Sequence, residues 1–171
     1  MWAMPTSILA LTYWLHLAAT IVWLGGLATL PLIVWPGLTR TPGDETHQTL
    51  LDDIERRFWP LANVSLVVLI ITGTLQMGDD PHYSGLFKID SPWAIGMLAK
   101  HIVIAGIVVA SIALQWSVQP ALDRAALLAR RGDTQGKDEE AGLRQQARRL
   151  ILLSLALGVL VLAFTAFITA L

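Results

Sequence analysis

The stretch LILLSLALGVLVLAFTAFITAL (150–171) contains no Asp, Glu, Lys or Arg. Charged residues are almost absent from four such stretches, at roughly 6–35, 58–78, 93–119 and 149–171. Each reaches the ~20 apolar residues that a helix needs to cross the hydrocarbon core of a bilayer. Such lengths without alternating polarity exclude a β-barrel. The sequence therefore predicts an all-α, polytopic integral membrane four-helix bundle that forms a single transmembrane domain over residues 1–171.

The composition excludes several classes of protein. With 54% hydrophobic and only 15% charged residues gathered outside the four stretches, the chain is not expected to be a soluble enzyme, a secreted domain or a nucleic-acid binder. It has no cysteine, which removes disulfides, thiolate metal ligands and iron–sulfur ligation. The first apolar run lacks a basic n-region and is longer than a signal-peptide core, so we expect it to be a retained span.

The distribution of basic residues predicts the topology. Most of the twelve Lys and Arg residues lie in the connections 36–57 and 120–148. The positive-inside rule places these two loops in the cytoplasm. Both termini and the loop 79–92 then face outward, which is an N-out/C-out arrangement. We therefore expect a multi-pass protein of the cell's inner (cytoplasmic) membrane, with the lipid bilayer as its surroundings.

Both cytoplasmic connections have helical character. Apolar residues from Leu50 to Phe58 recur at helical spacing, which indicates a short amphipathic helix on the membrane surface. The connection 120–148 is predicted to continue the third helix through Arg131, to turn at 132–136, and to begin a second helix that leads into the last span.

Two histidines lie inside predicted spans, whereas His47 and His82 fall in loops. His16 and His101 each lie about 12–15 Å below the outer surface at 1.5 Å per residue. An ionisable side chain is costly in hydrocarbon and normally faces the bundle interior, where it often serves a functional site. Because both spans run inward, the two imidazoles can face each other across the bundle. The alternative is that each histidine only forms hydrogen bonds for helix packing.

Further polar and aromatic residues gather near the same depth. Span two contributes Thr72, Gly73 and Gln76, and Lys100 precedes His101. Lys100 either extends to the outer interface or pairs with a haem propionate. The candidate cofactor-binding residues are His16, His101, Lys100, Trp23, Tyr13, Met97 and Gln76.

Two metals suit these residues. Haem b fits two neutral imidazoles as axial ligands, here His16 and His101 to the haem iron. Copper(I) prefers thioether and imidazole ligands. The candidate copper ligands, expected near the outer mouth of the bundle, are Met4, Met77, His82 and Met97.

The chain resembles a known family in its first three spans. His16, the run Trp23-Leu24-Gly25-Gly26-Leu27, Arg57-Phe58, Thr72-Gly73 and Lys100 are similar in order to the membrane domain of the copper resistance protein D family. They also resemble the related four-helix bacterial protoporphyrinogen oxidase family, which binds haem. The resemblance implies a haem- or copper-associated membrane module in which His16 and Lys100 are the family histidine and lysine. Leu98 stands where the oxidase-type family has a second histidine.

Three functions follow as hypotheses. The first is a membrane-embedded b-type haem protein that transfers electrons, or a haem-dependent oxidoreductase acting on a small diffusible molecule such as oxygen, nitric oxide or a quinone. The second is a copper transport or tolerance protein, and the third is a cofactor-free accessory subunit. A homodimer is a further expected partner arrangement, because small bundles often bury more surface by pairing.

Overall fold

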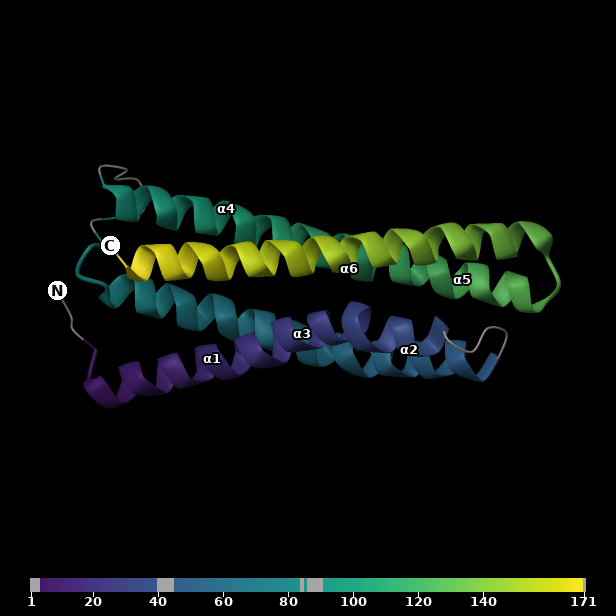
Figure 1. Cartoon of the computed structure of the whole chain (residues 1–171), viewed down its shortest axis with the longest axis horizontal. Coiled ribbons are helices and arrows are strands. Elements are labelled where there is room, and N and C mark those ends of the chain that lie inside the picture. Colours follow the sequence, from purple (N-terminus) through teal and green to yellow (C-terminus); the bar gives the residue numbers. More distant parts are fainter. Residues whose placement is uncertain (1–3, 40–44, 84, 86–90, 171) are drawn as a thin grey trace. The chain divides into compact units, whose positions relative to one another are not determined.

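The computed structural model describes residues 4–39, 45–83, 85 and 91–170, and the regular structure in this part of the chain is entirely helical (Figure 1). Backbone contacts divide the chain into two compact units, Met1–Ile89 and Asp90–Leu171. Four helical segments are long and apolar enough to cross a membrane: Thr6–Gly37, Asp53–Asp79, Pro92–Arg130 and Thr134–Thr169. The prediction of an all-α chain with four membrane-crossing helices is therefore confirmed.

The first unit is an antiparallel helical hairpin. Helix α1 (Thr6–Thr29) runs through a π-helical turn, η1 (Leu30–Val34), into the short helix α2 (Trp35–Thr39), and the long helix α3 (Glu45–Asp79) returns beside α1. Gly26 brings the two helices close together, because a Cβ atom at this position would overlap the ring of Phe58.

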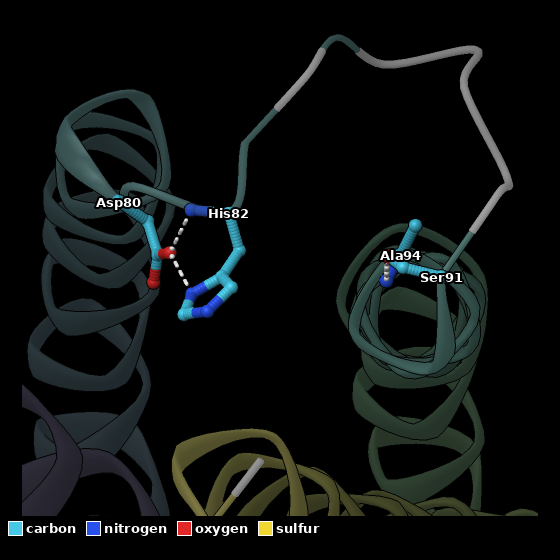
Figure 2. Close-up of polar contacts among 4 residues, drawn as sticks. All are labelled: Asp80, His82, Ser91 and Ala94. Carbon is cyan, nitrogen blue, oxygen red and sulfur yellow. Dashed lines mark hydrogen bonds and ion pairs between the residues drawn. The ribbon is translucent and has the colours of Figure 1, made fainter.

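The second unit has the same order of elements. Helix α4 (Pro92–Ile112) runs through a π-helical turn, η2 (Ala113–Val118), into α5 (Gln119–Arg130). Helix α6 (Thr134–Thr169) then returns and packs against both α4 and α5. The side chain of Ser91 caps α4 by accepting a hydrogen bond from the Ala94 amide at 3.2 Å (Figure 2). Small residues line this packing: Gly96 lies against Ile168, and Ala147, Ser154 and Gly158 are buried on α6.

Both π-helical turns immediately precede a proline-containing helix. The amide of Trp35 bonds to the Leu30 carbonyl, and the amide of Gln119 bonds to the Leu114 carbonyl, each five residues back. The next residue in each case is a proline, Pro36 or Pro120, which cannot donate a hydrogen bond and whose ring clashes with the carbonyl four residues back. The wider π turn gives this ring room, so the helix continues past the proline.

The connection between α5 and α6 confirms the predicted order of helix, turn and helix, but the turn is shorter than the predicted 132–136 because α6 already begins at Thr134. Gly132 has a φ of +87°, and the amides of Gly132 and Asp133 bond to the carbonyls of Ala129 and Leu128 at 3.0 and 3.3 Å. This pair of bonds around a left-handed glycine is a Schellman motif, which closes α5. Asp133 then caps α6 by accepting a hydrogen bond from the Gln135 amide at 3.0 Å.

The short surface helix predicted from Leu50 to Phe58 is not a separate element. These residues form part of α3, which runs without interruption from Glu45 through Pro60 to Asp79. Pro60 removes one backbone hydrogen bond, but the apolar periodicity on either side of it continues in one helix. Helix α3 is therefore longer than the apolar stretch 58–78 from which the second span was predicted.

Large apolar side chains remain exposed on both units. Ile21 is 73% exposed and Trp116 is 79% exposed. Soluble proteins rarely expose so many large apolar side chains, because their contact with water is unfavourable, whereas lipid solvates them. The exposure is what a chain surrounded by hydrocarbon requires.

Candidate functional site

Hydrogen bonds join α3 to α1 and to Met4, which precedes α1, and form a line of polar contacts inside an otherwise apolar hairpin. They join Nδ1 of His16 to Oγ1 of Thr72 at 2.8 Å, Nε2 of Gln76 to the Thr12 carbonyl at 3.2 Å, and the Met4 amide to Oδ1 of Asp79 at 3.0 Å. We call this series the polar line, and the end of the hairpin where it begins the Met4–Asp79 end. Thr72 precedes Asp79 by about two helical turns, so His16 lies roughly 10 Å from that end along the hairpin axis.

His16 is held closely by α3. Thr72 is only 4% exposed, so its hydroxyl group meets the imidazole away from solvent. A Cβ atom added to Gly73 would lie 3.4 Å from Cε1 of His16 and 3.9 Å from Nδ1, which are ordinary van der Waals distances and show that the ring packs next to this residue of α3. Thr20 also donates a hydrogen bond to the His16 carbonyl at 2.8 Å. The ring is therefore oriented by α3, whereas the contact from its own helix is to the His16 backbone.

The other predicted residues of the first unit differ in burial. Trp23 is 6% exposed, and Gln76 is half-buried in the polar line. Tyr13 is 51% exposed and is not on the side of α1 that carries Thr12, which is buried. Within this hairpin the structure places Gln76 in the polar line through its bond to the Thr12 carbonyl, and leaves Tyr13 on another side of α1.

The second unit carries the remaining predicted haem residues. Nδ1 of His101 lies 2.7 Å from the Met97 carbonyl, one turn back on the same helix. Because a carbonyl only accepts, this nitrogen carries a proton and donates it. His101 is exposed, and Met97 and Lys100 are half-buried. The predicted meeting of His16 and His101 joins one residue from each unit and stays a prediction.

Three of the predicted copper ligands, Met4, Met77 and His82, belong to the first unit and lie near the Met4–Asp79 end in sequence, and their meeting around one ion stays a prediction. Met77 is buried near the end of α3, and Met4 is tied to Asp79. Figure 2 shows His82 just beyond α3, where Oδ1 of Asp80 accepts a hydrogen bond from the His82 amide at 2.9 Å and lies 3.1 Å from its Nδ1. A carboxylate on one ring nitrogen orients a histidine so that the other nitrogen can bind metal.

Sequence reasoning missed two of these partners. Asp80 precedes His82 by two residues, a spacing at which aspartate commonly bonds to nearby backbone amides, so this contact had a local signal. Thr72 was expected at the depth of His16, but its direct contact with the imidazole joins residues 56 apart and has no local signal.

A ready-made metal cage of His, Cys, Asp and Glu is not present among the described residues, where no three such side chains converge. A copper ion would therefore need thioether, amide or hydroxyl groups in its surroundings besides imidazole and carboxylate. Met77 and Gln76 on α3 are such groups, and Cu(I) accepts thioether sulfur readily. The residues present fit copper in its reduced form better than a hard divalent ion.

A family model described as copper resistance protein D matches residues 52–168, more than half of the chain. The chain belongs to the copper resistance protein D family. Together with the four apolar helices, this membership makes it a multi-pass membrane protein. No curated protein and no solved structure matches the chain.

The residues matched by the copper resistance protein D model differ from those over which the resemblance was expected. The match includes α3 with Thr72 and Gly73, and α4 with Lys100, and it extends through α6. It begins after α1, so His16 and the Trp23 to Leu27 run lie outside it, whereas the resemblance was expected over the first three spans. The relation to the haem-binding protoporphyrinogen oxidase family, and with it the haem redox role, is not supported by this match.

Proposed function

We propose that this chain binds copper within the membrane and acts in copper transport or copper tolerance. The family match over residues 52–168 carries the proposal. It favours the second of the three functions expected from the sequence over the haem protein. Copper is the cargo in this proposal, and His16 is its ligand inside the span.

The order of donors along the first hairpin supports this function. Acidic and imidazole groups of Asp80 and His82 lie at the Met4–Asp79 end, where a cation in water would first meet the protein. Met77 lies on α3 close to this end, and His16 lies roughly 10 Å from the same end along the hairpin axis, by helical rise. A cation that leaves water needs such protein donors in turn, because hydrocarbon offers none.

The chemistry of the donors points to copper in its reduced state. Cu(I) binds thioether sulfur and neutral imidazole, and neither ligand brings a negative charge into the low-dielectric interior. The described part of α1 has no Asp or Glu, and beyond Glu55 the carboxylates of α3 and of the residue after it are those of Asp79 and Asp80, at the end of the hairpin. The interior donors therefore suit a soft monovalent ion, and the end of the hairpin can attract positive charge.

The test measures copper bound to the detergent-purified chain. The protein is stripped of metal, loaded with Cu(I) under ascorbate, freed of excess ion and analysed for copper per chain. We expect stoichiometric copper in the wild type and in the control His47→Ala, and loss of most of it in His16→Ala. A wild type without copper, or His16→Ala with full copper, contradicts the proposal.

An absorption spectrum of the same preparation separates the competing functions. Soret and α bands that shift on reduction with dithionite would identify a b-type haem protein and overturn the copper proposal. A colourless protein without copper would fit the cofactor-free accessory subunit, and would overturn it as well. A colourless protein with stoichiometric copper is the expected result.

A further inference from the structure

The hydroxyl group of Thr72 has one proton and several neighbours. Its Oγ1 lies 2.6 Å from the Val68 carbonyl, 3.5 Å from the Leu69 carbonyl and 2.8 Å from Nδ1 of His16. Carbonyl oxygens only accept hydrogen bonds, so the short contact with Val68 requires the hydroxyl proton. Oγ1 must then act as the acceptor toward His16, and Nδ1 of the imidazole must carry the donated proton.

This assignment decides the tautomer of His16. A neutral imidazole with its proton on Nδ1 has its lone pair on Nε2. Metal-binding histidines usually donate the proton of one ring nitrogen to a protein acceptor, which fixes the ring and directs the other nitrogen to the metal. The pair of His16 and Thr72 has this arrangement, with a hydroxyl group as the acceptor.

We infer that Thr72 is a positioning residue, which holds His16 in the Nδ1-protonated tautomer and so presents Nε2 as the copper-binding atom. This inference rests on the proposed copper function for its consequence, but the tautomer itself is a property of the metal-free protein. Because Thr72 is buried, water does not readily replace its hydroxyl group when the side chain is changed.

Gly73 shows that the ring packs beside Thr72 on α3. A Cβ atom at this position would meet Cε1 of His16 at 3.4 Å, which is an ordinary van der Waals distance, so the ring lies next to this part of the helix without being clamped by it. The bond to the Thr72 hydroxyl group is the contact that orients the ring. A ring held this way cannot exchange its two nitrogens by flipping without first breaking the bond to Thr72.

The experiment compares three variants on one helix. Thr72→Val removes the hydroxyl group at nearly constant volume, and Thr72→Ser restores it. Thr74→Val is the matched control, because Thr74 also donates to the carbonyl four residues back, Ile70 at 2.8 Å, but it is exposed and bonds to none of the histidine side chains that the structure describes. Protonated and unprotonated imidazole nitrogens differ widely in ¹⁵N chemical shift, and loss of signals in His16→Ala assigns those of His16.

In metal-free protein we expect a protonated Nδ1 and an unprotonated Nε2 for His16 in the wild type, Thr72→Ser and Thr74→Val. Thr72→Val should give a mixture of both tautomers. Cu(I) affinity, measured by competition with a chromophoric chelator, should fall roughly 10- to 100-fold in Thr72→Val and stay near the wild-type value in the other two.

The two readouts separate this inference from the function on which it rests. A wild-type His16 with its proton on Nε2, or a tautomer that survives Thr72→Val, overturns the role of Thr72 whatever copper does. A wild type with the expected tautomer and no copper binding overturns the proposed function, and it still supports Thr72 as the residue that sets the tautomer.

Discussion

The packing of α6 on α5 makes a quantitative prediction at Gly136. This residue lies in the first turn of α6 and is buried, and a Cβ atom added to it would lie 2.8 Å from Cβ of Leu128 and 2.9 Å from the backbone nitrogen of Ala129. Neither atom belongs to the end of a flexible side chain. Gly136→Ala therefore has to push the two helices apart.

The size of the effect follows from two opposing terms. Overpacking of this kind costs about 1–3 kcal/mol, whereas replacing glycine by alanine in a helix contributes up to about 1 kcal/mol of stability. Gly142→Ala is the matched control, because Gly142 lies on the same helix and its added Cβ would meet nothing within 4 Å. The propensity term largely cancels between the two variants, so their stabilities should differ by about 1–3 kcal/mol.

Thermal unfolding of the detergent-purified variants, followed by far-UV circular dichroism at one scan rate, checks this difference. At roughly 2–4 °C per kcal/mol for a chain of this length, Gly136→Ala should have a Tm about 2–12 °C below that of Gly142→Ala. A Tm for Gly136→Ala equal to or above that of Gly142→Ala would refute the close approach of α5 and α6.

Two further predictions concern the metal ligands. His101→Ala should retain membrane insertion, because this exposed side chain does not support the apolar spans, and it should keep near wild-type copper by elemental analysis, because His101 was expected as a haem ligand and is not among the copper ligands; loss of most of the copper would add His101 to the copper ligands. Asp80→Ala should weaken copper binding by roughly tenfold or less because it releases Nδ1 of the exposed His82, and Asp80→Asn, which keeps an acceptor oxygen, should weaken it less. Equal affinities for Asp80→Ala and the wild type in the chelator competition would show that the orientation of His82 is irrelevant.

The fold was predictable where it depends on local patterns. Charge-free length identified the four spans, and Gly132 with Asp133 identified the turn between α5 and α6, because a left-handed glycine and a helix-capping aspartate are local signals. The start of α3 was not predictable in the same way. The apolar spacing from Leu50 to Phe58 predicted a separate surface helix, but the helical periodicity continues through the span in one element.

The sequence predicted the depth of the candidate site residues in the membrane, but it did not predict which of them contact each other. Helical rise placed His16, Thr72 and Gln76 at a similar level, and the structure joins two of these residues directly and bonds the third to Thr12 on α1. Rise along a helix says nothing about rotation around its axis. This is why Tyr13, at the right depth, lies outside the polar line.

The three histidines whose side chains the structure describes share one feature, since each has Nδ1 in contact with an oxygen. For His82 and His101 that oxygen belongs to a residue two or four positions earlier, Asp80 or Met97, so the ring is oriented by its own chain segment. For His16 it belongs to Thr72 on the opposite helix. A change in the packing of α1 against α3 would therefore alter the orientation of His16 and leave the other two rings as they are. If copper binds at His16 as proposed, this is the histidine at which copper binding and helix packing are coupled, and copper that prefers the present orientation of the ring would by linkage also stabilise the α1–α3 hairpin.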